Sequence, residues 1–228
     1  MLTLAFDTSL RTASVSVLND DTLVYEMVIN AGANHSEVLL PAIDEACRKS
    51  RYRLHEMDLF CCTLGPGSFT GLRIGISTIK GLILATGKPA VGVSSLMALA
   101  MNVEKTQNVI CPVMDAGRGQ VYTASFLYDE NGVLNQIEPE KAVNPDHIGQ
   151  QPQNTIFIGD GALKYAESIA RHQEGVIVRT RLHQMIRGFH VGILGQEKYR
   201  RLDGPDASAF SPLYVRCADA IAAKSVFF

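Results

Sequence analysis

The sequence predicts an α/β protein made of two similar lobes, each of roughly 100 residues. One observation is a repeat: an apolar strand that ends in aspartate, then small residues and a second strand, occurs at Asp7 and again at Asp115. The other is that short strand-like runs, apolar or alternating, are interspersed along the chain with segments of helical periodicity. We divide the chain into lobes at 1–104 and 105–228, and the terminal segment is free to pack back on the first lobe.

The first lobe is expected to begin with three strands. Residues 2–7 are an apolar run, 12–18 and 22–29 alternate, and Asn19-Asp20-Asp21 supplies a turn. A helix follows over 35–50, with apolar residues at helical spacing. The remaining expected elements of this lobe are a strand at 59–64, a helix over about 70–85 and a strand at 90–94.

The second lobe is expected to start with strands at 109–115 and 121–127. A short strand at 155–158 precedes Gly159-Asp160-Gly161. A helix over 162–171, a strand near 175–179 and a helix over 184–200 complete it. Residues 203–206 (Asp-Gly-Pro-Asp) then break that helix, and the tail 212–216 is predicted to be a docking segment.

Composition narrows the classes of function. The chain has 228 residues, 46% apolar and 19% charged, with net charge −2, pI 6.3 and mean hydropathy +0.08. This balance argues against a basic surface that binds nucleic acid unaided. Five cysteines without a CxxC pair favour reduced thiols in a cytoplasmic protein. We expect no membrane span, because no apolar stretch is long enough.

The run from Gly65 to Gly75 (GPGSFTGLRIG) is the most informative motif. A glycine-rich turn between a strand and a helix is typical of a phosphate cradle, but no Gly-Lys-Ser/Thr follows it. Ser68 or Thr70 is expected to cap the helix. Gly71 and Gly75 lie one turn apart, and two interpretations stay open: the stripe packs on the protein's own sheet, or it admits a partner helix.

With these motifs in view, the chain resembles the TsaB (YeaZ) family over essentially its full length. The resemblance rests on motifs that appear in order: Asp7-Thr8-Ser9, Gly65–Gly75, Lys88-Pro89 before Val91-Gly92-Val93, Asp115-Ala116-Gly117-Arg118, Gly159-Asp160-Gly161 and Pro212–Arg216. It implies a duplicated actin/Hsp70/sugar-kinase-like (ASKHA) fold. It also implies a non-catalytic role in forming threonylcarbamoyladenosine at position 37 of tRNAs that read codons starting with A.

The resemblance implies partners as well. The family pairs with a catalytic paralogue, TsaD, or with itself as a homodimer, and an ATPase, TsaE, completes the complex. Contact with tRNA is then expected through the complex. Members use the two helices of the first lobe for pairing, so the predicted interface comprises Val38, Leu39, Ala42, Ile43, Ala46, Gly71, Leu72, Gly75 and Ile79.

The fold implied by the resemblance also suggests a residual nucleotide site. Its residues would be Asp7, Thr8, Ser9, Asp115, Gly117, Gly159 and Gly161. In kinases of this fold, aspartates at such strand ends act as a base or hold Mg²⁺ through water. The alternative is that each aspartate caps its own turn. We expect no required cofactor and at most weak nucleotide binding; a small-molecule kinase or ATPase is the alternative function.

Other chemistries are less well supported. The transferase paralogue carries a metal-binding His-x-x-x-His where this chain has Ser95 and Leu99, and leucine cannot ligate a metal. A hydrolase built on His35-Ser36-Glu37 or on Cys61 and Cys62 fails too. Neighbouring helical side chains diverge by about 100°, and thiols in an apolar strand are usually inert. We therefore predict no catalytic residue and no metal.

Overall fold

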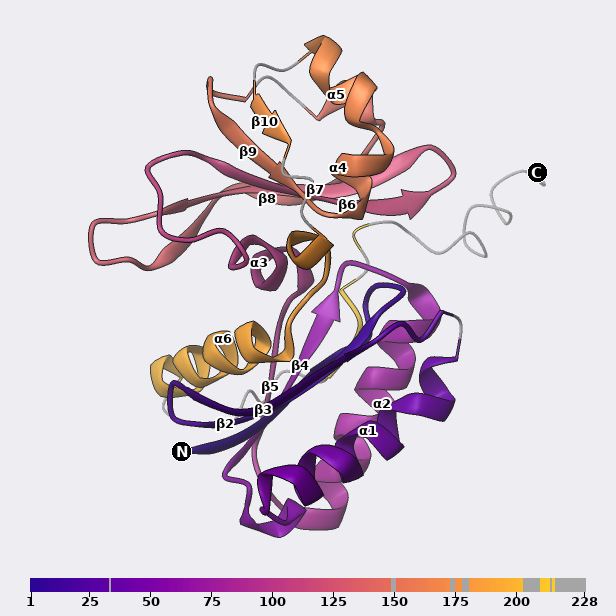
Figure 1. Ribbon diagram of the computed structural model, residues 1–228, viewed down its shortest axis with the longest axis vertical. Coiled ribbons are helices and arrows are strands. Elements are labelled where there is room, and N and C mark those ends of the chain that lie inside the picture. The colour runs from indigo at the N-terminus through magenta and orange to yellow at the C-terminus, as the bar shows by residue number, and fades with distance from the viewer. Residues whose placement is uncertain are drawn as a thin grey trace, which may run out of the picture.

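Two five-stranded mixed sheets, one in each lobe, form the framework of the protein (Figure 1). The computed structural model describes residues 1–32, 34–148, 151–172, 175–177, 181–202, 210–213 and 215. The predicted helix break at 203–206 lies outside these residues. None of the helices in the described part of the chain combines the length and the apolar composition that crossing a bilayer requires.

The first sheet has the strand order β3-β2-β1-β4-β5. The pairs β1–β2 and β2–β3 are antiparallel, and β1–β4 and β4–β5 are parallel. Asp20, with φ at 51°, forms the predicted turn between β2 and β3. The bounds are β1 Leu2–Asp7, β2 Ala13–Asn19, β3 Thr22–Ile29, β4 Leu59–Gly65 and β5 Ala90–Ser94.

The second sheet repeats this topology, with the order β8-β7-β6-β9-β10. Its first two pairs are again antiparallel and its last two parallel. The predicted duplication is therefore confirmed in its topology, with β8 as a strand that the sequence did not predict. The bounds are β6 Ile110–Gly117, β7 Gln120–Tyr128, β8 Leu134–Val143, β9 Thr155–Ile158 and β10 Gly175–Ile177.

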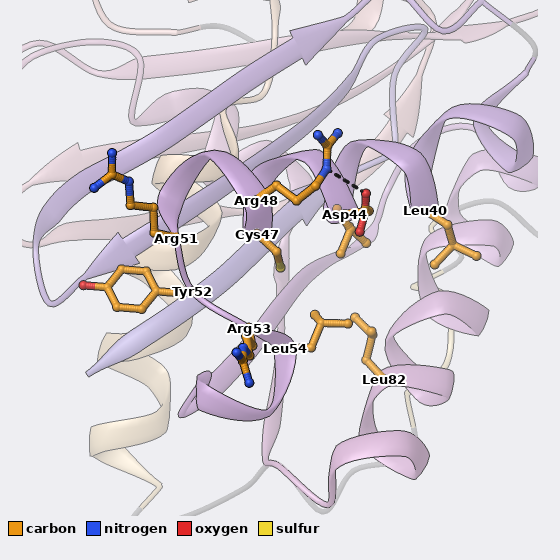
Figure 2. Close-up of a pocket in the computed structure, with 10 residues that line it drawn as sticks. Leu40, Asp44, Cys47, Arg48, Arg51, Tyr52, Arg53, Leu54 and Leu82 are labelled. Atoms are coloured by element: carbon orange, nitrogen blue, oxygen red, sulfur yellow. Dashed lines mark hydrogen bonds and ion pairs between the residues drawn. The ribbon is translucent and has the colours of Figure 1, made fainter.

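Two long helices cover one face of the first sheet (Figure 1). Helix α1 spans His35–Ser50, and α2 spans Phe69–Thr86, where the Ser68 hydroxyl accepts a hydrogen bond from the Gly71 N–H, 3.2 Å away. The predicted cap at Ser68 is thus confirmed. A one-turn helix η1 (Leu54–Glu56) follows α1, and a hollow opens between it and α2 (Figure 2).

The other face of the first sheet is covered by α6 (Gly188–Arg201), which comes from the second half of the chain (Figure 1). Cβ atoms built at Gly188, Gly192 and Gly195 would overlap atoms of this sheet, so the absence of side chains there lets the helix approach. Gln196 on α6 donates to the Thr3 hydroxyl at 3.0 Å and to the Asp20 carbonyl at 2.9 Å.

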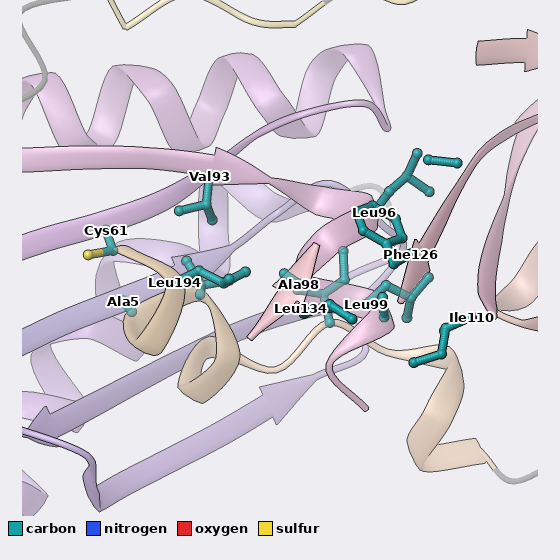
Figure 3. Packing of buried hydrophobic residues seen from close by; sticks show 14 of the residues in the cluster. Ala5, Cys61, Val93, Leu96, Ala98, Leu99, Ile110, Phe126, Leu134 and Leu194 are labelled. Atoms are coloured by element: carbon teal, nitrogen blue, oxygen red, sulfur yellow. The ribbon is translucent and has the colours of Figure 1, made fainter. Parts of the chain in front are cut away.

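One hydrophobic core joins the two lobes. Helix α3 (Ser95–Ala100) contributes Leu96, Ala98 and Leu99 to a buried cluster that reaches both sheets. Figure 3 shows these residues, with Leu134 and Phe126 beside them, between Ala5, Cys61, Val93 and Leu194 on one side and Ile110 on the other. Because the cluster is continuous, separating the lobes would expose apolar surface.

The remaining elements are short. They are α4 Asp160–Lys164, α5 Ala166–His172 and the one-turn helices η2 Pro145–His147 and η3 Arg181–Gln184. The single helix predicted over 162–171 is divided at Tyr165 into α4 and α5. In the described part of the tail, the Leu213 N–H donates to the Leu64 carbonyl at 2.7 Å, and Phe210 packs on the first lobe. The described tail residues thus dock as predicted.

Candidate functional site between the lobes

A cleft of about 300 Å³ lies where the strand ends of the two lobes face each other. The β1–β2 turn and the start of α2 form one wall. The β6–β7 turn and the start of α4 form the other wall. The lining residues are Ser9, Leu10, Arg11, Gly32, Gly67, Ser68, Phe69, Asp115, Ala116, Gly117, Tyr122 and Asp160.

Asp7, at the end of β1, is fully buried beneath this cleft. Its Oδ1 accepts hydrogen bonds from the Ser9 hydroxyl and the Thr63 hydroxyl, each at 2.6 Å, and from the Ser9 N–H at 3.1 Å. Its Oδ2 has no hydrogen-bond partner among the described residues. Burial raises the pKa of Asp7, and the hydrogen bonds from Ser9 and Thr63 oppose that rise. The side chain is held by its own turn.

Thr8 and Ser9 connect this turn to helix α2. The Thr8 hydroxyl donates to the Gly71 carbonyl at 2.8 Å, and the Ser68 N–H donates to the Ser9 carbonyl at 2.7 Å. Both residues are buried. Their polar atoms are therefore used within the chain.

Asp115, near the end of β6, does line the cleft, but its carboxylate is occupied. The Lys164 ammonium lies 2.6 Å from Oδ2, and Oδ1 accepts the Gly117 N–H at 3.0 Å. Asp160 lies beside it and accepts from the N–H groups of Asp115 (3.0 Å) and Gly161 (2.8 Å). Burial raises the pKa of Asp160. Sequence reasoning missed Lys164, because a contact between residues 49 positions apart leaves no local pattern.

Gly159 and Gly161 pack against the chain itself. A Cβ at Gly159 would lie 2.3 Å from the Val113 carbonyl oxygen, and one at Gly161 would lie 2.8 Å from the Met114 carbonyl carbon. These glycines therefore let the β9–α4 turn press against β6. Gly117, with φ at +71°, has open space around it.

Ser95 and Leu99, where the resemblance places two imidazoles in the transferase, are part of the core here. Leu99 is fully buried in the cluster that joins the lobes, and the buried Ser95 hydroxyl has no hydrogen-bond partner in the part of the chain that the structure describes. Within the described residues, no group of three or more His, Cys, Asp or Glu side chains is arranged to hold a metal ion.

The thiols are similarly inert. Cys61, Cys62 and Cys111 are buried, and burial raises the pKa of each, to about 12 for Cys111. His35 is buried at the start of α1, whereas Ser36 is exposed. Burial and a raised pKa disfavour the thiolate form that a cysteine nucleophile needs.

The predicted interface residues on α1 and α2 mostly face their own sheet. All of them except Val38 are buried. A Cβ at Gly71 would lie 2.0 Å from the Thr8 carbonyl oxygen, and one at Gly75 would lie 2.5 Å from the Thr8 hydroxyl. The glycine stripe therefore serves a contact within the lobe, which is the first of the two interpretations given above.

Different residues form the outer face of the two helices. Leu40, Phe69 and Leu84 are large apolar side chains that are 58%, 43% and 87% exposed. The Arg73 guanidinium lies over the Phe69 ring, 3.9 Å from its centre. A hollow of about 440 Å³ between α1 and α2 includes Leu40, Phe69 and Arg73 in its lining. Leu40, Phe69 and Arg73 are not among the interface residues that the sequence predicted.

The duplicated sheets and the cleft between their turns define a protein of the actin/Hsp70/sugar-kinase-like (ASKHA) class. A family model described as TsaD, tRNA N6-adenosine threonylcarbamoyltransferase, matches residues 29–188. The tRNA threonylcarbamoyladenosine biosynthesis protein TsaB of Bacillus subtilis (strain 168) is 31% identical over 226 residues, covering 96% of each chain. The chain belongs to the TsaB family.

Another TsaB protein and two solved structures are also similar to this chain. The TsaB protein of Escherichia coli (strain K12) is 32% identical over 167 residues, which cover 71% of this chain and 72% of that protein. The solved structure of YeaZ from Pseudomonas aeruginosa matches with a TM-score of 0.79 at 24% identity, covering 93% of this chain and 99% of that one. Component A of (R)-2-hydroxyglutaryl-CoA dehydratase from Acidaminococcus fermentans shares the fold (TM-score 0.51, 11% identity, covering 88% and 99%).

Proposed function

We propose that this chain is a non-catalytic subunit in the synthesis of threonylcarbamoyladenosine. In this proposal it binds and activates a TsaD-type transferase, which transfers the threonylcarbamoyl group to adenosine 37 of tRNAs that read ANN codons. A TsaE-type ATPase joins the complex, and tRNA is contacted through it. The chain works in the cytoplasm and forms a homodimer when the transferase is absent.

The carboxylates at the cleft are buried or already paired, and this observation supports the proposal that the chain is not catalytic. Asp7 is buried beneath the cleft, Asp115 is paired with Lys164, and Asp160 accepts two backbone N–H groups. A base or Mg²⁺ ligand must be accessible to its substrate. The continuous core between the lobes also opposes the closure movements by which many enzymes enclose a substrate.

The same observations support weak nucleotide binding at most. The two turns do face each other across the cleft, which is the feature that favours the alternative of a small-molecule kinase or ATPase. ATP hydrolysis that appears with a hydroxyl or carboxylate acceptor and is abolished by Asp7→Asn would establish that alternative.

A reconstitution assay tests the leading proposal. Threonylcarbamoyl transfer to tRNA by the transferase of the same organism is measured with and without this chain. We expect transfer to depend on it, and full transfer in its absence would overturn the proposal.

We take the outer face of α1 and α2 as the pairing surface, and Leu40→Asp tests it because Leu40 is exposed there and lines the hollow between the two helices. Size-exclusion chromatography with light scattering should show loss of the complex. Leu202→Asp is the matched control, since Leu202 is 50% exposed at the end of α6, on the other face of the sheet.

A further inference from the structure

A second hollow, of about 490 Å³, lies at the C-terminal end of α1 (Figure 2). It is bounded by α1, the segment 51–53, η1 and α2. Its lining residues are Leu40, Ile43, Asp44, Cys47, Arg48, Arg51, Tyr52, Arg53, Leu54 and Leu82. We call it the arginine-rimmed pocket.

The floor of this pocket is apolar. Ile43 and Cys47 from α1 and Leu82 from α2 form it with Leu54 from η1, and Figure 2 shows Leu54 beside Leu82. Leu40 extends the apolar surface along α1. Leu40 and Cys47 are two helical turns apart, about 10 Å along the axis. The floor is therefore long enough for two turns of a second helix.

The rim carries an excess of positive charge. It holds Arg48, Arg51 and Arg53 but a single carboxylate, that of Asp44. Asp44 already pairs with Arg48, with 3.0 Å between Oδ2 and Nε. Among the contacts of the described residues, no carboxylate pairs with the side chain of Arg51 or Arg53.

Helix electrostatics explain only part of this cluster. Cations near a helix C-terminus are stabilised by the helix dipole, which accounts for Arg48 and for Arg51 at the C-cap. Arg53 lies beyond the helix, in the extended segment that leads to η1. Its guanidinium adds hydrogen-bond donors to the pocket, and the dipole of α1 does not account for their presence there.

The charge also bears on what can cover the pocket. In a two-fold dimer centred here, each rim would meet an identical rim. Guanidinium groups would then face guanidinium groups across a desolvated contact, which is unfavourable. A second copy of this chain is therefore a poor occupant, whereas a surface with carboxylates around apolar side chains is complementary.

We propose that the arginine-rimmed pocket binds an acidic amphipathic helix of a partner protein. Its apolar side chains lie on the floor, and its carboxylates pair with Arg51 and Arg53, since guanidinium binds carboxylate with two parallel hydrogen bonds. The proposal rests on the proposed function in taking the TsaD-type transferase as the protein that supplies the helix. Binding of a synthetic helix of this kind does not depend on that identity.

The first test uses a synthetic probe. It is a fluorescein-labelled helical peptide with leucines at i, i+3, i+4 and i+7 and glutamates elsewhere. Its binding to the full chain is followed by fluorescence polarisation at about 50 and about 300 mM NaCl. We expect binding that weakens with salt and becomes about tenfold weaker in the double variant Arg51→Glu/Arg53→Glu.

Two controls sharpen this test. Arg201→Glu reverses an exposed arginine on α6, on the opposite face of the sheet, and should bind the probe as the parent does. A peptide with lysine in place of glutamate should not bind. Equal binding of the two peptides, or unchanged binding in the double variant, would overturn the proposal.

A second measurement separates this inference from the proposed function. The double variant is assayed for binding to the TsaD-type transferase and for self-association. Weaker transferase binding with unchanged self-association supports the inference. If the double variant binds the transferase as the parent does, the inference fails while the proposed function stands. If the parent chain binds the probe but not the transferase, the inference stands and the proposed function fails. Loss of self-association would assign the pocket to a second copy and overturn the inference.

Discussion

Replacing Gly71 by alanine should destabilise the first lobe, although alanine is the better helix former. A Cβ at Gly71 would lie 2.0 Å from the Thr8 carbonyl oxygen and 3.2 Å from the Thr8 carbonyl carbon. These are backbone atoms of a buried turn, so no rotamer change relieves the overlap. The turn must move, and that strains the hydrogen bond from the Thr8 hydroxyl to the Gly71 carbonyl.

The magnitude follows from two opposing effects. Forcing an extra carbon into a packed site costs about 1–3 kcal/mol, and a backbone clash belongs at the upper end. The gain in helix propensity from glycine to alanine is at most about 1 kcal/mol. We therefore expect Gly71→Ala to lower the free energy of unfolding by about 2 kcal/mol.

Gly81→Ala is the matched control. Gly81 lies on the same helix and is exposed, and no described residue outside its own helical turn comes within 4 Å of its built Cβ. It should raise the free energy of unfolding by up to about 1 kcal/mol. Urea unfolding followed by circular dichroism, at two protein concentrations, measures both variants. A Gly71→Ala protein as stable as the parent would refute the intrachain role, and a loss that depends on protein concentration would point to an interface.

Three further predictions concern the buried charges and the cleft. Burial, and secondarily Arg187, lower the pKa of His190 to about 4 from 6.5. Between those pH values the unfolded chain takes up a proton that the folded chain excludes. The free energy of unfolding should therefore fall by up to about 3 kcal/mol as pH drops from 6.5 to 4. In urea titrations His190→Asn should flatten this slope, and an unchanged slope would contradict the assignment. Glu26 accepts hydrogen bonds from Arg187 Nε at 2.8 Å, the Phe189 N–H at 3.0 Å and the Ser16 hydroxyl at 2.8 Å. Glu26→Ala should therefore cost about 2 kcal/mol of unfolding free energy, whereas Glu56→Ala at an exposed site should cost far less. Calorimetric titration with ADP and Mg²⁺ should give a dissociation constant of about 1 mM or weaker, because the Asp115 carboxylate is already paired with the Lys164 ammonium. Micromolar binding would disprove the proposal that the cleft binds nucleotide weakly at most.

Most of the fold could be predicted because its patterns are local. The strands of the first lobe and helix α1 are where periodicity places them, since one buried face imposes a period of 2 or 3.6 residues. The edge strand β8 was missed. It is half exposed and contains Pro139, so it lacks the alternation of a central strand.

The candidate site was harder to predict, because its contacts join distant parts of the chain. Asp7 ends β1 as predicted, whereas β6 continues past Asp115 to Gly117. The contact of Asp115 with Lys164 arises only when α4 folds against β6. The glycines of α2 were recognised as a close-contact stripe. Sequence alone left open which surface approaches them, and the structure places Thr8 there.

Helix α6 has a consequence for synthesis of the chain. The first sheet is made from residues 2–94, yet much of one of its faces is covered by residues 188–201. A ribosome-bound chain that ends before residue 188 therefore exposes buried positions such as Ala5, Leu18 and Cys61 to water. The N-terminal lobe, although translated first, reaches its final packing only when nearly the whole chain has emerged.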